Sequence, residues 1–253
     1  MPMKKLRALM KNLLHTRMVH GRLFYTLSRL RLNPVVQLYQ KEIQKNLSLG
    51  VYYVYGARVE GDIVEFGTDS GFTACSLAKS INMANSWVTD IQPKKLFLFD
   101  SFEGLPPINS NIDRRSHHVL KRIWYKGACV GLNSMQLHEL CGFFYEQKKI
   151  NIIEGWFKDT VKQLPNDTKF SMIHFDGDLY QSTIDALDPC FKRGLISTGA
   201  IVFFDDYDCN QANPASGERK AWQELVEKYS IKFTDQGPYS WGCRKFIIHN
   251  YIS

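Results

Sequence analysis

The chain has 253 residues, of which 44% are hydrophobic and 13% aromatic, which is enough apolar material for one sizeable core. This composition excludes a wholly disordered chain. The sequence contains no run of about 18 apolar residues, which a transmembrane helix would need. The formal net charge is +7, but residues 1–31 hold eight basic side chains and no acid. The other 222 residues carry 24 basic against 25 acidic side chains, so the main body is nearly neutral.

The N-terminal segment is the basic part of the chain. We expect residues 1–50 to form a basic helical arm ahead of a main domain at 51–253, because apolar residues and cations alternate at roughly helical spacing within residues 1–31. Such an arm could make a peripheral contact with a membrane of anionic lipids. We favour a structural role, in which the arm packs on its own domain or on the second subunit of a homo-oligomer, most simply a dimer.

The segment lacks the unbroken apolar stretch and cleavage site of a signal peptide, and an organellar transit peptide is the less favoured alternative. The six cysteines are scattered, with no CxxC pair and no zinc-binding spacing. This usage is typical of free thiols in a reducing compartment and predicts a cytoplasmic protein.

From about residue 60 the chain alternates short apolar runs with segments of helical spacing. The runs predict five buried strands and one final strand, at residues 61–67, 95–100, 149–155, 170–176, 199–206 and 244–250. Near-continuous Val, Ile, Leu and Phe with helices in between predict an α/β fold, in which a mostly parallel sheet has helices on both faces. Residues 105–150 are polar, aromatic and punctuated by glycine, and they predict an insert between the second and third strands.

Four acids follow two of the predicted strands. Asp176 and Asp178 come directly after the fourth strand, and Asp205 and Asp206 end the fifth. An isolated buried charge is too costly to keep, so such carboxylates must be hydrated, paired or bound to a cation. Ligands of an open α/β sheet bind outside the carboxyl ends of its strands. The pattern therefore predicts a functional site at this edge of the sheet.

The first strand ends in a glycine-containing loop, GTDSG, at residues 67–71. Glycine lets the backbone turn sharply and approach a ligand, and the helix that follows presents free N–H groups. The spacing differs from the G-x-G-x-x-G pattern of dinucleotide binding. Asp100 closes the second strand, where an acid can accept hydrogen bonds from both hydroxyls of a ribose. Together these features predict a cofactor that contains a nucleoside.

Five motifs resemble those of the macrocin O-methyltransferase (TylF/MycF) family of S-adenosylmethionine- and magnesium-dependent sugar methyltransferases. They are GDIVEFGTDSG (61–71), LFDSFEGLP (98–106), IIEGWFKDT (152–160), IHFDGDLYQST (173–183) and FFDDY followed by GERKA (203–207 and 217–221). The resemblance covers about residues 55–250 and implies a class I methyltransferase (Rossmann-like) fold. It also implies S-adenosyl-L-methionine and Mg²⁺ as cofactors, with methyl transfer to a hydroxyl of a sugar or glycosylated small molecule.

The resemblance, carried over motif by motif, also implies the site residues. The expected cofactor-binding residues are Glu65, Gly67, Thr68, Gly71, Phe72, Asp100, Ser101, Phe102, Trp156 and Phe157. The expected metal ligands are Asp176, Asp205 and Asp206. A cation there would lower the pKa of the acceptor hydroxyl, and Asp176 could take up its proton. Alternative bases are Asp178, which could instead cap the next helix, together with His174, His117 and His118.

Some features depart from the family pattern. The loop after Asp206 is longer than usual, and residues 1–31 and 108–126 match no motif of the family, so these two segments are expected to contact the acceptor. A phenolic or catechol hydroxyl is the alternative acceptor. A non-catalytic module of the same fold, bound to a membrane or nucleic acid through its basic arm, is the alternative function. We favour the enzyme, without a nucleic-acid partner, because clustered carboxylates repel one another when no cation is bound.

Overall fold

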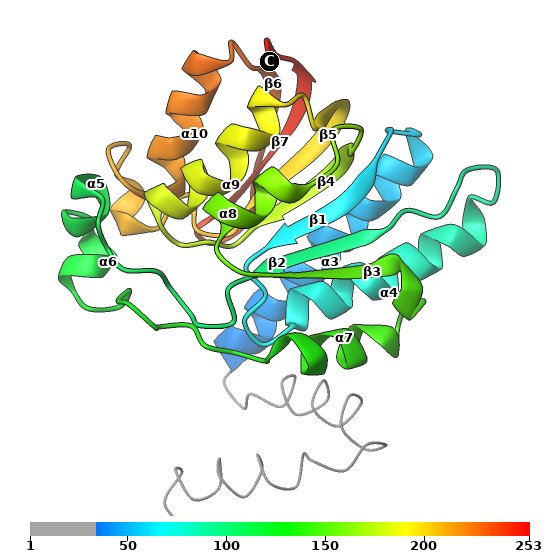
Figure 1. The fold of residues 1–253 in the computed structure, drawn as a ribbon, viewed down its shortest axis with the longest axis horizontal. Coiled ribbons are helices and arrows are strands. Elements are labelled where there is room, and N and C mark those ends of the chain that lie inside the picture. The colour runs from blue at the N-terminus through cyan, green and yellow to red at the C-terminus, as the bar shows by residue number, and fades with distance from the viewer. Residues whose placement is uncertain (1–33) are drawn as a thin grey trace, which may run out of the picture.

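The computed structural model describes residues 34–253, so the expected membrane contact of residues 1–31 lies outside the described part of the chain. Its centre is a seven-stranded sheet in the order β3-β2-β1-β4-β5-β7-β6 (Figure 1). The strands are β1 (Asp62–Phe66), β2 (Leu96–Asp100), β3 (Ile150–Glu154), β4 (Phe170–Phe175), β5 (Ile196–Phe204), β6 (Lys232–Ser240) and β7 (Cys243–Asn250). Strands β1 to β5 pair in parallel, whereas β7 is antiparallel to β5 and to β6. The predicted α/β sheet is confirmed.

Strand β6 is not revealed by the apolar pattern. Its sequence, KFTDQGPYS, contains Gly237 and Pro238, and most of its side chains are exposed or only partly buried. It lies at the edge of the sheet and pairs only with β7. An edge position tolerates polar side chains and proline, because one side of the strand needs no ladder of hydrogen bonds.

Helices cover both faces of the sheet, as predicted (Figure 1). One face carries α3 (Pro34–Gly56), α4 (Phe72–Trp87) and α7 (Ser134–Gly142), and the other carries α8 (Phe157–Thr160), α9 (Tyr180–Lys192) and α10 (Gly217–Lys228). Each layer packs against the sheet through its own cluster of buried apolar side chains. Among residues 34–253, no helix is both long and apolar enough to cross a membrane.

Helix α3 runs without a break across the expected boundary between residues 50 and 51. Ile43, Leu47 and Val51 on this helix are buried in the core. Gly50 lets the helix approach the sheet, because a Cβ there would lie 2.7 Å from the ring of Phe203. Residues 34–50 therefore pack as part of the main domain instead of forming an arm apart from it.

The insert between β2 and β3 contains α5 (Asn111–Arg114), α6 (His117–Leu120) and α7. A small apolar core of its own joins Leu105, Trp124 and Ala128 to Leu179 before α9. The buried carboxylate of Asp113 accepts the backbone N–H groups of residues 180 and 181 at the start of α9, at 2.9 and 3.1 Å. These contacts fix the insert beside the carboxyl ends of the strands.

Candidate active site

A cavity of about 450 Å³ opens at the carboxyl ends of β1 to β4. Strand-end residues 67–69, 100–101, 155–158 and 176–179 line it, together with 104–107, 109, 113 and 129 of the insert and 181, 182 and 185 of α9. This volume falls in the range at which proteins bind cofactors and small molecules. A smaller cavity of about 140 Å³ shares Thr68, Asp69 and Asp176 with the first and is lined on another side by α3.

The ends of β1 and β4 approach each other closely at Gly67. The φ angle of Gly67 is +87°, and a Cβ there would overlap the carbonyl oxygen of Asp176. The backbone N–H of Asp176 in turn donates to the carbonyl of Phe66 at 2.8 Å. The strand order reverses at β1, since β2 lies on one side of it and β4 on the other. This is the position at which open α/β sheets bind their ligands.

Asp100 connects the loop after β1 to the loop after β2. Its Oδ2 accepts the backbone N–H and the hydroxyl of Thr68, at 2.7 and 2.9 Å, and its Oδ1 accepts the backbone N–H of Phe102 at 2.8 Å. The side chain also lines the cavity. A carboxylate has about four acceptor positions, so Asp100 keeps room for a ligand hydroxyl.

The other expected cofactor residues divide between the two cavities and the protein interior. The larger cavity is lined by Gly67, Thr68, Ser101, Trp156 and Phe157, and the smaller one by Thr68 and Phe72. The lining of these two cavities does not include Glu65, Gly71 or Phe102. Their role as direct cofactor contacts stays a prediction.

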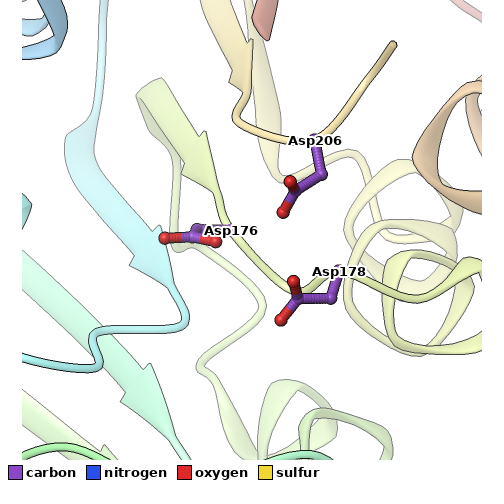
Figure 2. A group of neighbouring side chains, drawn as sticks. All are labelled: Asp176, Asp178 and Asp206. Carbon is purple, nitrogen blue, oxygen red and sulfur yellow. The ribbon is translucent and has the colours of Figure 1, made fainter. Parts of the chain in front are cut away.

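Three carboxylates gather where β4 and β5 end (Figure 2). Asp176, Asp178 and Asp206 each offer an oxygen, and these oxygens all lie within 4.8 Å of one another. Asp178 has a φ angle of 61°, a left-handed conformation that non-glycine residues rarely adopt and that is common at functional sites. Carboxylate oxygens are the ligands that magnesium prefers.

Burial, and after it repulsion among the acids, raises the pKa of all three carboxyl groups, that of Asp206 to about 6. A hydrogen bond between Asp178 and Asp206 adds to the rise for Asp178 and limits it for Asp206. A divalent cation among these oxygens would favour the charged forms and remove the repulsion. The donor set therefore fits a bound metal.

Asp205 is held apart from this cluster. Its Oδ2 accepts the hydroxyl of Tyr39 in α3 at 2.6 Å, and its Oδ1 accepts the hydroxyl of Tyr239 in β6 at 3.1 Å. Burial alone would raise the pKa of Asp205, but interactions with His174 and Tyr39 lower it. The structure thus groups Asp178 with Asp176 and Asp206, where the sequence favours Asp205, although Asp205 still lines the smaller cavity beside Asp176.

The side chain of His174 lies between the carboxylates of Glu65 in β1 and Asp205, which follows β5. Its Nδ1 lies 2.8 Å from Oε1 of Glu65, and its Nε2 lies 3.9 Å from Oδ1 of Asp205. Burial would lower the pKa of His174, but the two carboxylates raise it to about 9, which makes the ring an imidazolium. A fully buried, protonated ring is a poor general base. The structure therefore favours a positioning role for His174.

Two further groups support Asp206. The thiol of Cys209 donates to Oδ1 of Asp206 at 2.9 Å, and the backbone N–H of Asp206 donates to Glu218 at 3.0 Å. Glu218 is fully buried, and burial followed by the charge of Asp206 raises its pKa well above the usual range. Glu218 is not among the site residues that the sequence predicts. Its signal in the sequence is an acidic residue on the side of α10 that carries the buried apolar side chains.

The two alternative histidines lie in the insert. His118 stacks on Trp124 with ring centroids 4.5 Å apart, and its Nδ1 accepts the backbone N–H of Asn210 at 3.1 Å. Burial lowers the pKa of His118. Neither His117 nor His118 lines the two described cavities. The contacts of His118 with Asn210 join the insert to the loop after β5.

Comparison with known proteins adds a family match. The model of the macrocin-O-methyltransferase (TylF) family matches residues 39–233. The chain is 27% identical over 186 residues to the demethyldecarbamoylnovobiocin O-methyltransferase of Streptomyces niveus, covering 73% of this chain and 67% of that protein. It is 28% identical over 166 residues to the 8-demethyl-8-(2,3-dimethoxy-alpha-L-rhamnosyl)-tetracenomycin-C 4'-O-methyltransferase of Streptomyces olivaceus, covering 64% of this chain and 59% of that protein.

Solved structures show the same fold. The O-methyltransferase NovP superposes with a TM-score of 0.67 at 22% identity, covering 83% of this chain and 80% of that one. The calicheamicin methyltransferase CalS11 superposes with a TM-score of 0.60 at 21% identity, covering 98% and 93%. The expected class I methyltransferase fold is confirmed by this likeness.

Proposed function

Because the chain belongs to the macrocin O-methyltransferase (TylF) family of S-adenosylmethionine-dependent enzymes, as its motifs predict, we propose that it methylates a sugar hydroxyl of a glycosylated small molecule. One observation carries the proposal: a single cavity of about 450 Å³ joins the expected cofactor loops to Asp176 and Asp178 of the acidic cluster. The tetracenomycin relative, named for a rhamnosyl-bearing substrate, supports a sugar acceptor.

S-Adenosyl-L-methionine would occupy the part of the cavity at the ends of β1 to β3. The free acceptor position of Asp100 would take a ribose hydroxyl, and Trp156 and Phe157 would flank the adenine. The backbone of the loop at residues 67–69 would approach the methionine part. This arrangement would direct the methyl group toward the acidic cluster.

Mg²⁺ is the cation that we propose for the cluster, held by Asp176, Asp206 and either Asp178 or Asp205. Asp178 is already grouped with the other two, whereas Asp205 would have to leave its contacts with Tyr39 and Tyr239. The bound ion supplies a Lewis acid that lowers the pKa of the acceptor hydroxyl.

Asp176 is the base that we propose, with Asp178 as the alternative, because both line the cavity. In the reaction, this carboxylate would take the hydroxyl proton as the acceptor oxygen bonds to the methyl carbon. The bond between that carbon and sulfur would break, which would leave S-adenosylhomocysteine. Only a group within hydrogen-bonding reach of the hydroxyl can take this proton.

An acceptor panel tests the proposal. The full chain is incubated with S-adenosyl-L-methionine, Mg²⁺ and either glycosides or catechols, and mass spectrometry detects the gain of one methyl group. We expect product from a glycoside. Product from catechols alone would move the acceptor class to phenols. Failure to bind S-adenosyl-L-methionine in calorimetry, with heat from NAD, would refute the cofactor assignment.

We further propose a cytoplasmic enzyme that forms a homodimer. The six cysteines are unpaired, which supports a reducing compartment. Light scattering of the full chain at several concentrations measures the oligomeric state, and a monomer at all of them would reject the dimer.

A further inference from the structure

The insert exposes a surface in which cations alternate with large apolar side chains. We call it the insert face, and it consists of exposed residues between 114 and 130: Arg114, Arg115, Leu120, Lys121, Arg122, Ile123, Tyr125, Lys126 and Val130. The exposed fractions of Leu120 and Val130 are 67% and 60%, and those of Ile123 and Tyr125 are 52% and 56%. Single exposed apolar side chains are common on protein surfaces, whereas four large ones within residues 120–130 indicate a contact surface.

Exposed acids do not balance these cations. Between Glu103 and Glu139 the chain has one acid, Asp113, against five basic residues. Asp113 is 1% exposed, and its carboxylate accepts hydrogen bonds from backbone N–H groups at the N-terminus of α9. Outside the stretch 104–138, residues 32–253 carry 19 basic and 24 acidic side chains. The stretch 104–138 therefore has a net charge of +4, whereas the rest of residues 32–253 has a net charge of −5.

The exposed apolar side chains are not the core of the insert. That core is formed by Trp124, 5% exposed, with Leu105 and Ala128. The stacking of His118 on Trp124 and the bonds of Asp113 to α9 hold the segment in place. The insert thus presents its apolar side chains from a supported backbone.

The combination of basic side chains with exposed aliphatic and aromatic side chains indicates the kind of partner. We infer that the insert face docks on a bilayer of anionic lipids, with Leu120, Ile123 and Tyr125 entering the boundary between headgroups and acyl chains and the cations contacting the headgroups. Polar faces rich in Lys and Arg beside Leu, Ile and aromatic side chains are typical of segments that lie in this interface. A two-fold contact between copies would bring the same five cations against one another. Aliphatic side chains such as Leu120 and Val130 do not match a phosphate backbone.

Docking would also place the membrane near the mouth of the cavity. Leu105, Pro107, Asn109 and Cys129 of the insert line that cavity, and α5 and α6 project from the same end of the molecule (Figure 1). The docking itself requires no methyl transfer. Its test is therefore independent of the proposed function.

The test is co-sedimentation of the full chain with vesicles of phosphatidylglycerol and phosphatidylcholine, compared with vesicles of phosphatidylcholine alone. Two double variants change the face: Lys121→Glu with Arg122→Glu, and Ile123→Ser with Tyr125→Ser. The matched control is Lys148→Glu with Lys149→Glu, which makes the same charge change just before β3, at the opposite end of that strand from the cavity. Thermal unfolding checks that each variant is folded.

Wild type should bind the anionic vesicles and lose binding as salt rises. Since a basic residue near an anionic surface contributes about 1 kcal/mol, the charge variant should bind about tenfold more weakly or worse. The apolar variant should also bind more weakly, while the control should match wild type. If one variant fails to fold, the other decides.

Three outcomes would overturn the inference. Wild type could show no preference for anionic vesicles. Both variants could bind like wild type, in which case residues 1–31 would account for the binding. A variant could change the oligomeric state in light scattering with unchanged vesicle binding, which would assign the face to a contact between copies.

Discussion

Replacing Asp206 by Asn should stabilise the metal-free protein. The pKa of this partly buried carboxyl group rises from 3.8 to about 6, mainly by burial and then by the charge of Asp205. A shift of about two units corresponds to about 3 kcal/mol of unfavourable free energy when the group is charged. Asn keeps the shape and an oxygen to accept the thiol of Cys209, but it carries no charge. We therefore expect the variant to gain about 2–3 kcal/mol at pH 8 in chelator.

The gain should depend on pH with a definite sign. The folded state binds a proton at Asp206 up to about pH 6, and the unfolded state only up to its ordinary pKa of 3.8. The free energy of unfolding of wild type therefore falls as the pH rises through this window, and the whole penalty is present above it. The advantage of the variant should be complete at pH 8, shrink below pH 6 and vanish below 3.8.

Urea denaturation followed by circular dichroism measures the effect. With a slope of about 2–3 kcal/mol per molar, the midpoint of the variant should rise by about 1 M at pH 8 in chelator. Magnesium should reverse the order at about one thousand times its dissociation constant, where it stabilises the native wild type by about 4.1 kcal/mol, more than the advantage of the variant. The exposed Asp167→Asn is the control. A variant less stable than wild type in chelator, or a difference independent of pH, would refute the reasoning.

The remaining predictions concern the cofactor, the metal, the backbone and the arm. Asp100→Ala should weaken binding of S-adenosyl-L-methionine by roughly 1.5–3 kcal/mol in calorimetry, through loss of charge-assisted hydrogen bonds, and unchanged affinity would move the ribose acceptor elsewhere. Methyl transfer should stop in chelator and return with magnesium, and Asp176→Asn should lower the rate by about 10² to 10⁴, whereas full activity in excess chelator would exclude a metal role. Gly67→Ala should destabilise the protein in thermal unfolding far more than Gly237→Ala, because both glycines have positive φ but only a Cβ at residue 67 would meet backbone atoms. Equal melting temperatures would contradict the close approach between Gly67 and the carbonyl oxygen of Asp176. Deletion of residues 1–31 should change the oligomeric state in light scattering, and loss of salt-sensitive vesicle binding from a domain of unchanged state would instead indicate a membrane role.

The parallel strands β1, β2, β4 and β5 could be predicted because most of their side chains are buried and each strand therefore reads as an apolar run. Phe170–Phe175, for example, is buried at every position. Strand β6 could not, because its position at the sheet edge depends on pairing with β7 and not on its own side chains. The sequence predicts a boundary at residue 50 because the basic charge is confined to the N-terminal part of the chain, whereas the packing of α3 on the sheet includes Ile43 and Leu47 before that boundary.

The site could be located from the sequence, but the direction in which each acidic side chain points could not be predicted. Asp205 and Asp206 are neighbours after an extended strand, and successive side chains there point to opposite sides. The partners that hold Asp205 are Tyr39 and Tyr239, 166 and 34 residues away in the chain. Only the folded arrangement of α3 and β6 brings these hydroxyls to one carboxylate, so no local pattern distinguishes the two acids.

The charge balance of the site connects its two proposed ligands. Among residues 34–253, none of the ion pairs joins a lysine or arginine to Asp176, Asp178 or Asp206, and the one buried imidazolium, His174, is shared by Glu65 and Asp205. When the carboxyl groups of the cluster are ionised, their negative charge is therefore uncompensated in a partly buried setting, where electrostatic attraction is stronger than in water. A divalent cation and the sulfonium of S-adenosyl-L-methionine both supply the missing positive charge. The sulfonium loses its charge when the methyl group leaves, so the same field that attracts the cofactor holds S-adenosylhomocysteine less strongly and favours its release.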